Sequence, residues 1–103
     1  MERDEFMSGL AGNFDDALKI VERKNMDYAD GADPFQNFRM VENTGLVSVE
    51  QGIAVRMTDK MQRIINLLED EPEVADESLE DSLLDLINYS NIMLLYLKEE
   101  RDN

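Results

Sequence analysis

Residues 76–100, DESLEDSLLDLINYSNIMLLYLKEE, are the most informative part of this chain for its fold class. Large apolar residues recur there every three or four positions, which is the period of an α-helix. One side of this predicted helix carries Leu79, Leu83, Leu86, Met93 and Leu97. At about 100° per residue, Leu84, Ile92 and Leu95 lie on the opposite side. A helix that is apolar all round is covered on more than one face, so we expect a second subunit to cover part of it.

Three further helices are expected upstream of this one. The first spans about residues 4–25 and has an apolar seam of Met7, Leu10, Phe14, Ala17 and Val21. The polar stretch 25–33 that follows is typical of a loop. The third helix ends near Glu69 and has a core stripe of Ile53, Met57, Met61, Ile64 and Leu68. No segment alternates as a β-strand does, so the sequence predicts one all-α domain, residues 1–103, resembling a four-helix bundle.

Two segments carry the signature of a helix start. In Asp33-Pro34-Phe35-Gln36 the aspartate can cap, the proline fits the first turn, and the glutamine is spaced for a capping box. The short second helix should end near Thr44, with Gly45 as a left-handed stop. Ser48-Val49-Glu50-Gln51 repeats the capping signal before the third helix.

Composition restricts the chemistry that the chain can perform. Ten Lys and Arg oppose 24 Asp and Glu, and the net charge of −14 repels nucleic acids and anionic membrane surfaces. The chain has neither Cys nor His, which excludes disulfides, thiolate metal sites, Ser–His catalysis and the HExxH zinc motif. A bound metal would therefore have oxygen ligands and would be Mg²⁺, Mn²⁺ or Ca²⁺. No apolar run is long enough to span a membrane and the acidic start MERDEF is no signal peptide, so we expect a cytoplasmic protein.

An acidic stripe runs along the predicted fourth helix. Glu77, Asp81, Asp85 and Asn88 step by four, four and three positions and share one face. That face becomes apolar one or two turns later, so we expect the carboxylates to enter or border a buried layer. Burying unpaired charge costs on the order of several kcal/mol, so the stripe needs partners. A divalent cation would relieve the repulsion between its like charges.

The third helix offers a basic stripe, Arg56, Lys60 and Arg63, around Asp59. Two interpretations stay open. In one, these cations form a salt-bridge lattice with the acidic stripe. In the other, they form a phosphate-binding wall that faces a metal held by the acidic stripe.

Further polar groups gather in the segment 24–31. An ordinary solvated turn explains them on composition alone. In a binding site, Tyr28 could stack on a base and Lys24 could reach a phosphate. The amides of Asn37 and Asn88 could read a base edge, or they could serve as a cap and a core hydrogen bond.

Three blocks of sequence resemble a known family. Residues 24–30, KNMDYAD, followed by Asn37-Phe38, resemble a K-N-x-D-Y-x-D … N-F pattern. Residues 56–63, RMTDKMQR, resemble R-x-x-D-K-x-x-R, and residues 76–89 resemble D-E-S-x-x-D-x-L-x-D-L-x-N-Y. In this order and spacing the blocks resemble the nucleotide modification associated domain 1 family, which is common in phages and bacteria. That family is similar to the all-α nucleoside triphosphate pyrophosphohydrolases, the MazG and dimeric dUTPase group.

This resemblance, which covers about residues 20–97, implies a MazG-like helical bundle that forms a dimer or tetramer. It also implies a nucleotide ligand and Mg²⁺ or Mn²⁺ held by carboxylates. The metal ligands and catalytic residues that it implies are Glu77, Asp81 and Asp85. The residues that it implies for nucleotide binding are Lys24, Asp27, Tyr28, Asn37, Arg56, Lys60, Arg63 and Asn88.

The chain departs from the hydrolase pattern on its third helix. The relatives carry a Glu-x-x-Glu pair there, whereas this helix offers only Asp59, and the literal pair Glu77–Glu80 belongs to the fourth helix. Three functions therefore stay open. The first is an Mg²⁺-dependent pyrophosphohydrolase that releases pyrophosphate from an NTP or dNTP. The second is a non-catalytic protein that sequesters or senses a nucleotide, and the third is an acidic structural or inhibitory protein, for instance one encoded by a phage.

Overall fold

Every regular element of the described chain is an α-helix. The computed structural model describes residues 1–28, 33–69 and 78–102, with side chains throughout except at residues 25–28. Within them lie α1 (Arg3–Tyr28), α2 (Gln36–Asn43), α3 (Val49–Glu69) and α4 (Leu79–Asp102). The predicted all-α class is thus confirmed for these residues.

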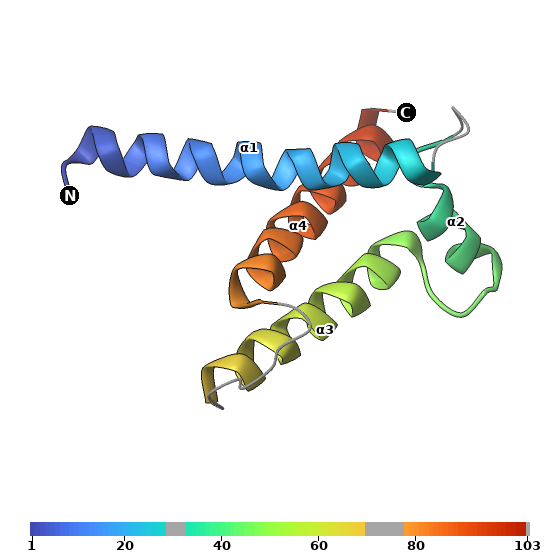
Figure 1. The fold of residues 1–103 in the computed structure, drawn as a ribbon. Coiled ribbons are helices and arrows are strands. Elements are labelled where there is room, and N and C mark those ends of the chain that lie inside the picture. The colour runs from blue at the N-terminus through green and yellow to red at the C-terminus, as the bar shows by residue number, and fades with distance from the viewer. Residues whose placement is uncertain (29–32, 70–77, 103) are drawn as a thin grey trace.

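The helices are arranged around the pair α3 and α4, which lie side by side and run in opposite directions (Figure 1). The short α2 packs on α3, and α1 crosses α4 at a steep angle (Figure 1). Within the described residues α1 packs on α4 and on no other helix. None of these helices is long and apolar enough to cross a lipid bilayer.

The hydrophobic core lies where α2, α3 and α4 meet. Its buried residues are Phe35, Val49, Ile53 and Tyr96. Partly buried apolar side chains from the same helices surround them: Phe38, Met57, Tyr89, Ile92 and Met93. This core joins the middle of the chain to its C-terminal helix and leaves α1 outside it.

Local sequence signals define several helix ends as predicted. At the start of α3 the Ser48 amide donates to Gln51 Oε1 over 2.9 Å, and the Gln51 amide donates to Ser48 Oγ over 3.1 Å. This reciprocal pair is the predicted capping box. Gly45 has a φ of 77°, the left-handed stop expected after α2. Ser78 Oγ accepts from the Asp81 amide at the start of α4, while the start predicted near residue 76 lies outside the described residues.

Two predictions about the first half of the chain were wrong. Residues 25–28 are the last turn of α1 and not a loop, because no Gly or Pro interrupts the chain between Gly12 and residue 31. The capping box predicted at Gln36 is also absent, since that residue is the first of α2 and its N-cap is Phe35. Asp33 instead accepts a hydrogen bond from the Phe35 amide.

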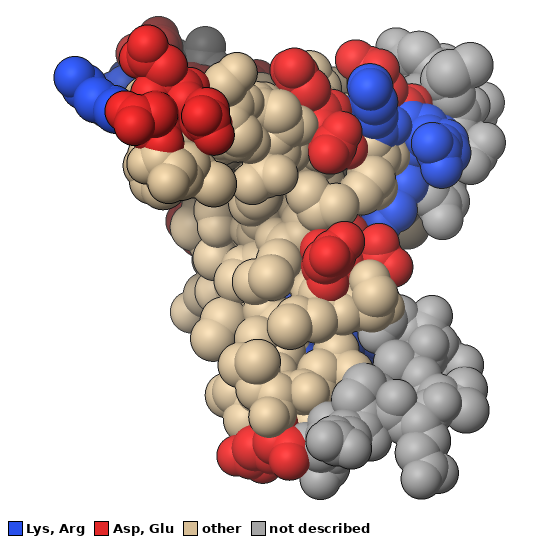
Figure 2. Space-filling view, turned by 60° about the vertical axis from the view of Figure 1, so that its left-hand side comes forward, with Lys and Arg blue, Asp and Glu red and all other residues tan. Residues whose placement is uncertain are grey.

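Much of the predicted apolar seam of α1 is exposed to solvent. Among its members only Ala17, at 1% exposure, is buried. On α3, Met61 and Leu68 of the predicted core stripe are exposed as well, while Ile53 and Ile64 are buried. Figure 2 shows a broad uncharged expanse on one face of the molecule, with acidic side chains above and below it. Periodicity therefore identified apolar faces that the rest of the described chain does not cover.

Candidate functional site

Asp85 is the centre of a charged cluster to which three helices contribute. Its Oδ2 lies 2.8 Å from Lys60 Nζ of α3, and its Oδ1 lies 3.9 Å from Lys24 Nζ of α1. The side chains of Asp85 and Lys60 are only 14% and 16% exposed, whereas Lys24 is 59% exposed. The inner pair is therefore shielded from water, and removing one partner would leave the other charge poorly compensated. We call these three residues the Asp85 cluster.

The rest of the acidic stripe differs from Asp85 in its surroundings. Asp81, one turn earlier on α4, is exposed, so the prediction that the carboxylates border a buried layer holds for Asp85 and not for Asp81. Asp81 lies in the first helical turn, where the helix dipole stabilises a negative charge without burial. Glu77 lies outside the described residues.

Asn88 joins α4 to α1. Its Nδ2 donates to the carbonyl oxygen of Ala17 over 3.0 Å, and the residue is 8% exposed. The structure thus gives Asn88 the core hydrogen bond that was one of its two open interpretations. It lies one turn from Asp85 on the same helix face. By holding α1 against α4, it also helps to keep Lys24 beside Asp85.

The predicted basic stripe follows one face of α3. Arg56 lies with its guanidinium over the ring of Phe38, 5.7 Å from the ring centroid. Lys60, one turn later, belongs to the Asp85 cluster, and Arg63 is exposed one turn further on. The salt-bridge interpretation is therefore realised at Lys60, and the same contact places the stripe beside Asp85.

The remaining predicted binding residues are distributed over α1 and α2. Lys24 lies on α1, at the end of the predicted first helix, and reaches Asp85 from there. Asp27 and Tyr28 belong to the last turn of α1, and their side chains lie outside the described part of the chain. Asn37 is exposed on α2, and no contact within the described residues joins it to the Asp85 cluster.

The described residues do not by themselves complete a metal site. Within residues 1–28, 33–69 and 78–102 no three acidic side chains are grouped closely enough to hold an ion. Asp81 and Asp85 supply two carboxylates one helical turn apart, but Lys60 already contacts Asp85 Oδ2. A cation at Asp85 would have to compete with that ammonium group.

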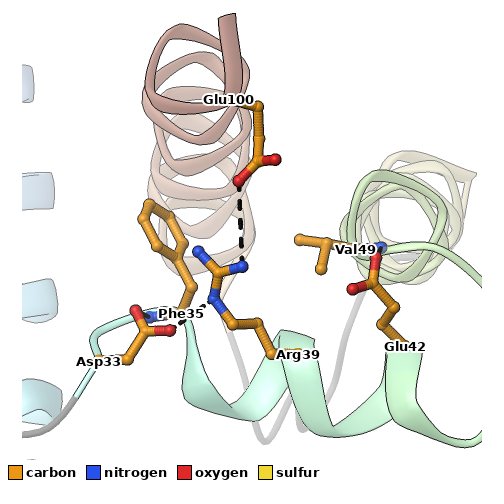
Figure 3. A network of polar contacts seen from close by, with 6 residues as sticks. All are labelled: Asp33, Phe35, Arg39, Glu42, Val49 and Glu100. Carbon is orange, nitrogen blue, oxygen red and sulfur yellow. Dashed lines mark hydrogen bonds and ion pairs between the residues drawn. The ribbon is translucent and has the colours of Figure 1, made fainter. Parts of the chain in front are cut away.

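Sequence reasoning missed a second charged network, centred on Arg39 of α2. Figure 3 shows its guanidinium between Asp33 and Glu100 of α4, with the Glu100 Oε1 oxygen 3.9 Å from Nη1. The same guanidinium lies 5.7 Å from the Phe35 ring centroid and 5.5 Å from that of Tyr96. Because these partners lie up to 61 positions from Arg39 in the sequence, no local sequence motif predicts them. The network attaches α2 to the C-terminal half of α4.

Asp33 is held in its charged form by this arrangement. The Phe35 amide, which donates to Asp33 Oδ1 over 3.0 Å, lowers the pKa of the carboxyl below its ordinary value, and the Arg39 side chain lowers it further. A side-chain oxygen of Glu42 accepts from the Val49 amide over 3.4 Å and ties the end of α2 to the start of α3 (Figure 3). Both contacts position helices, and neither lies in the Asp85 cluster.

Comparison with known protein families places most of the chain in one family model. The family model described as nucleotide modification associated domain 1 matches residues 24–97. The matched range begins at Lys24 and includes the whole Asp85 cluster. No curated protein and no solved structure matches the chain.

Proposed function

The chain belongs to the nucleotide modification associated domain 1 family, and on that basis we propose that it binds a nucleotide at the Asp85 cluster. We propose further that it acts as an Mg²⁺-dependent pyrophosphohydrolase on an NTP or dNTP. In that reaction water hydrolyses the phosphoanhydride bond between the α- and β-phosphates, and the products are a nucleoside monophosphate and pyrophosphate. The observation that carries the proposal is the convergence of Lys24 of α1 and Lys60 of α3 on Asp85 of α4.

Electrostatics favours this location for an anionic ligand. A chain with a net charge of −14 repels a triphosphate unless cations are concentrated locally. Lys24 and Lys60 provide such a concentration, and Arg56 and Arg63 extend it along α3. Lys24 makes the longer contact with Asp85 and is the more exposed lysine, so it is better placed to meet a phosphate from solvent.

The proposal includes Mg²⁺ or Mn²⁺, with Glu77, Asp81 and Asp85 as ligands. An ion bound there would polarise a phosphoryl oxygen and lower the pKa of its bound water. Support comes from the donor set, because a chain without Cys or His offers oxygen ligands, which these ions prefer. Two of these three carboxylates, Asp81 and Asp85, belong to the described residues.

Kinship with the MazG and dimeric dUTPase group, and self-association, are further parts of the proposal. The kinship is supported by the sequence blocks 56–63 and 76–89. Self-association is supported by large apolar side chains of α4 that the chain leaves about half exposed: Leu83, Leu94 and Leu95. A cytoplasmic location, where nucleoside triphosphates are made, fits this function.

Nucleotide binding without hydrolysis is the second candidate. It is favoured by the 2.8 Å contact between Lys60 and Asp85, which engages a carboxylate that a metal would need. In that case the same lysines would hold the phosphates, and the protein would sequester or sense the nucleotide.

A panel of NTPs and dNTPs with Mg²⁺ or Mn²⁺ tests the proposal, with pyrophosphate and monophosphate as readouts. Lys24→Gln should raise KM about tenfold, since a charge-assisted hydrogen bond contributes roughly 1.5–3 kcal/mol. Lys19→Gln, the same change at an exposed lysine of α1, is the control and should leave KM unchanged. Asp81→Asn, at an exposed position, should abolish turnover without loss of helicity.

The outcomes separate the two candidates. Metal-dependent release of monophosphate, lost in Asp81→Asn and Asp85→Asn, would support hydrolysis. Full activity in both variants would show that the proposed metal site is wrong. Saturable binding without product, weakened by Lys24→Gln, would select the non-catalytic candidate, and a folded protein that binds no nucleotide would refute both.

A further inference from the structure

The N-terminal half of α1 is an apolar ridge that the described chain leaves uncovered. We define the ridge as Phe6, Met7, Leu10 and Phe14, which are 41–62% exposed. These residues lie on the same face of α1 as Ala17, the residue buried against α4. Figure 1 shows that this half of α1 projects well beyond its crossing with α4. The face that packs on α4 therefore continues into solvent for several turns.

A helix projecting in this way needs a cover to be stable. Isolated helices shorter than about 12–15 residues are marginal in water, and most helical stability in proteins comes from packing of the apolar face. Gly9 and Gly12 each weaken the helix by about 1 kcal/mol relative to alanine. Apart from the neighbouring backbone of α1 itself, no described atom lies within 4 Å of the position that a Cβ would take at either glycine, so no tight packing against another element compensates.

A groove of about 1080 Å³ lies beside the ridge, between α1 and α4. The groove is open to solvent and is not an enclosed cavity. Large apolar side chains from both helices line it, among them Phe14, Leu18, Leu83, Leu86, Leu94 and Leu95. Phe14 belongs to both the ridge and the groove, so the two form one continuous apolar surface.

From this surface we infer that two copies of the chain form a two-fold dimer in which the ridge of each copy enters the α1–α4 groove of the other. Under a two-fold axis both ridge–groove contacts form at once, so the assembly closes at two copies and covers both surfaces. The inference rests on the self-association in the proposed function and is independent of its nucleotide part.

The exposed area agrees with what a stable dimer needs. Eight large apolar side chains of the ridge and groove are 41–62% exposed: Phe6, Met7, Leu10, Phe14, Leu18, Leu83, Leu94 and Leu95. Half-exposed side chains of this size present roughly 100 Å² each, which gives on the order of 800 Å² per copy. A stable protein interface buries about 800 Å² on each partner.

The charges around the groove also favour a second copy over a basic partner. A net charge of −14 would attract a basic protein. However, the charged residues that line the groove are Asp15 and Lys98, one of each sign. A basic partner would meet Lys98 as well as Asp15, whereas a second copy presents both signs and can match them.

Mass measurement in solution tests the inference. At tens of micromolar, light scattering after size exclusion should give the wild type twice the chain mass of 11.9 kDa. Leu10→Glu and Phe14→Glu should reduce it to one chain mass, because each places a carboxylate in the interface. Leu46→Glu, at a position that is 83% exposed between α2 and α3, is the matched control and should remain dimeric.

A cross-linking experiment covers the case in which the glutamate variants fail to fold. The chain has no cysteine, so Leu10→Cys combined with Leu94→Cys gives two unique sites. A short bismaleimide should then yield a covalent dimer in dilute solution, and Leu46→Cys should not. A monomeric wild type would refute both this interface and self-association. A dimer whose mass survives Leu10→Glu, or that lacks the cross-link, would refute the interface alone.

Discussion

Tyr96 combines the core and the charged network of α2 in one side chain. It is 4% exposed, and its ring packs edge-on against Phe35 with the centroids 5.5 Å apart. Burial raises the pKa of its phenol above the ordinary value of 10.0, and nearby carboxylates raise it further, Glu100 foremost. The Arg39 guanidinium acts in the opposite direction. The neutral phenol is therefore the form that the folded chain prefers.

This preference predicts a loss of stability in alkali. Because the folded-state pKa is raised, the contribution is fully present below pH 10 and is lost as the pH rises from there through the folded-state pKa. Urea unfolding of the wild type should show a steeper fall in the free energy of unfolding above pH 10 than that of Tyr96→Phe. Parallel curves for the two proteins would show that Tyr96 ionises as freely in the folded state as in the unfolded state.

The Asp85 cluster shows how far single residues could be predicted. The sequence placed an acidic and a basic stripe on neighbouring helices, and contact between them was one of two open interpretations, which Lys60 and Asp85 realise. The hydrogen bond from Asn88 to Ala17 could not be predicted, because 71 positions separate these residues and no local pattern relates them. The position of Arg39 depends on tertiary packing in the same way.

Helix ends were predicted well where the signal involves only nearby residues. The capping box of α3 and the left-handed Gly45 follow from contacts within three positions, so the sequence is sufficient for them. The start of α2 was predicted within residues 33–36, but its capping box was predicted wrongly, because Asp33 makes its side-chain contacts with Phe35 and with Arg39, six positions away. Whether an Asp caps or pairs thus depends on the neighbours that the fold supplies.

The capping box makes a prediction about α3. Ser48→Ala removes the oxygen that accepts from the Gln51 amide, so the free energy of unfolding should fall by about 1 kcal/mol. Ser90→Ala is the matched control, because its hydroxyl donates to a carbonyl within α4 and alanine favours a helix interior. Thermal and urea unfolding at a single protein concentration measure both. An equal effect of the two changes would mean that the box adds nothing to stability.

The assembly of the helices was the least predictable feature of the whole molecule. The hydrophobic periodicity identified apolar positions on α1, α3 and α4, but it cannot say which element covers them. The sequence suggested a second subunit from α4 alone, whereas the structure exposes α1 even more extensively. The physical reason is that α2, α3 and α4 build the core. Within the described residues, α1 lies outside this core and packs only on α4, where the two helices cross.

Net charge and an apolar interface together predict how salt affects the proposed dimer. Each copy carries a charge of −14, so association must overcome repulsion that acts over roughly 10 Å at 0.1 M salt and about 3 Å at 1 M. Screening should therefore strengthen the dimer, and the dissociation constant should fall about tenfold, or ~1.4 kcal/mol, between low and molar salt. Sedimentation equilibrium across a NaCl series measures this. An interface held by ion pairs would weaken over the same series, because salt screens attraction as well as repulsion. The sign of the salt dependence thus distinguishes the apolar ridge from a charged contact without any change to the sequence.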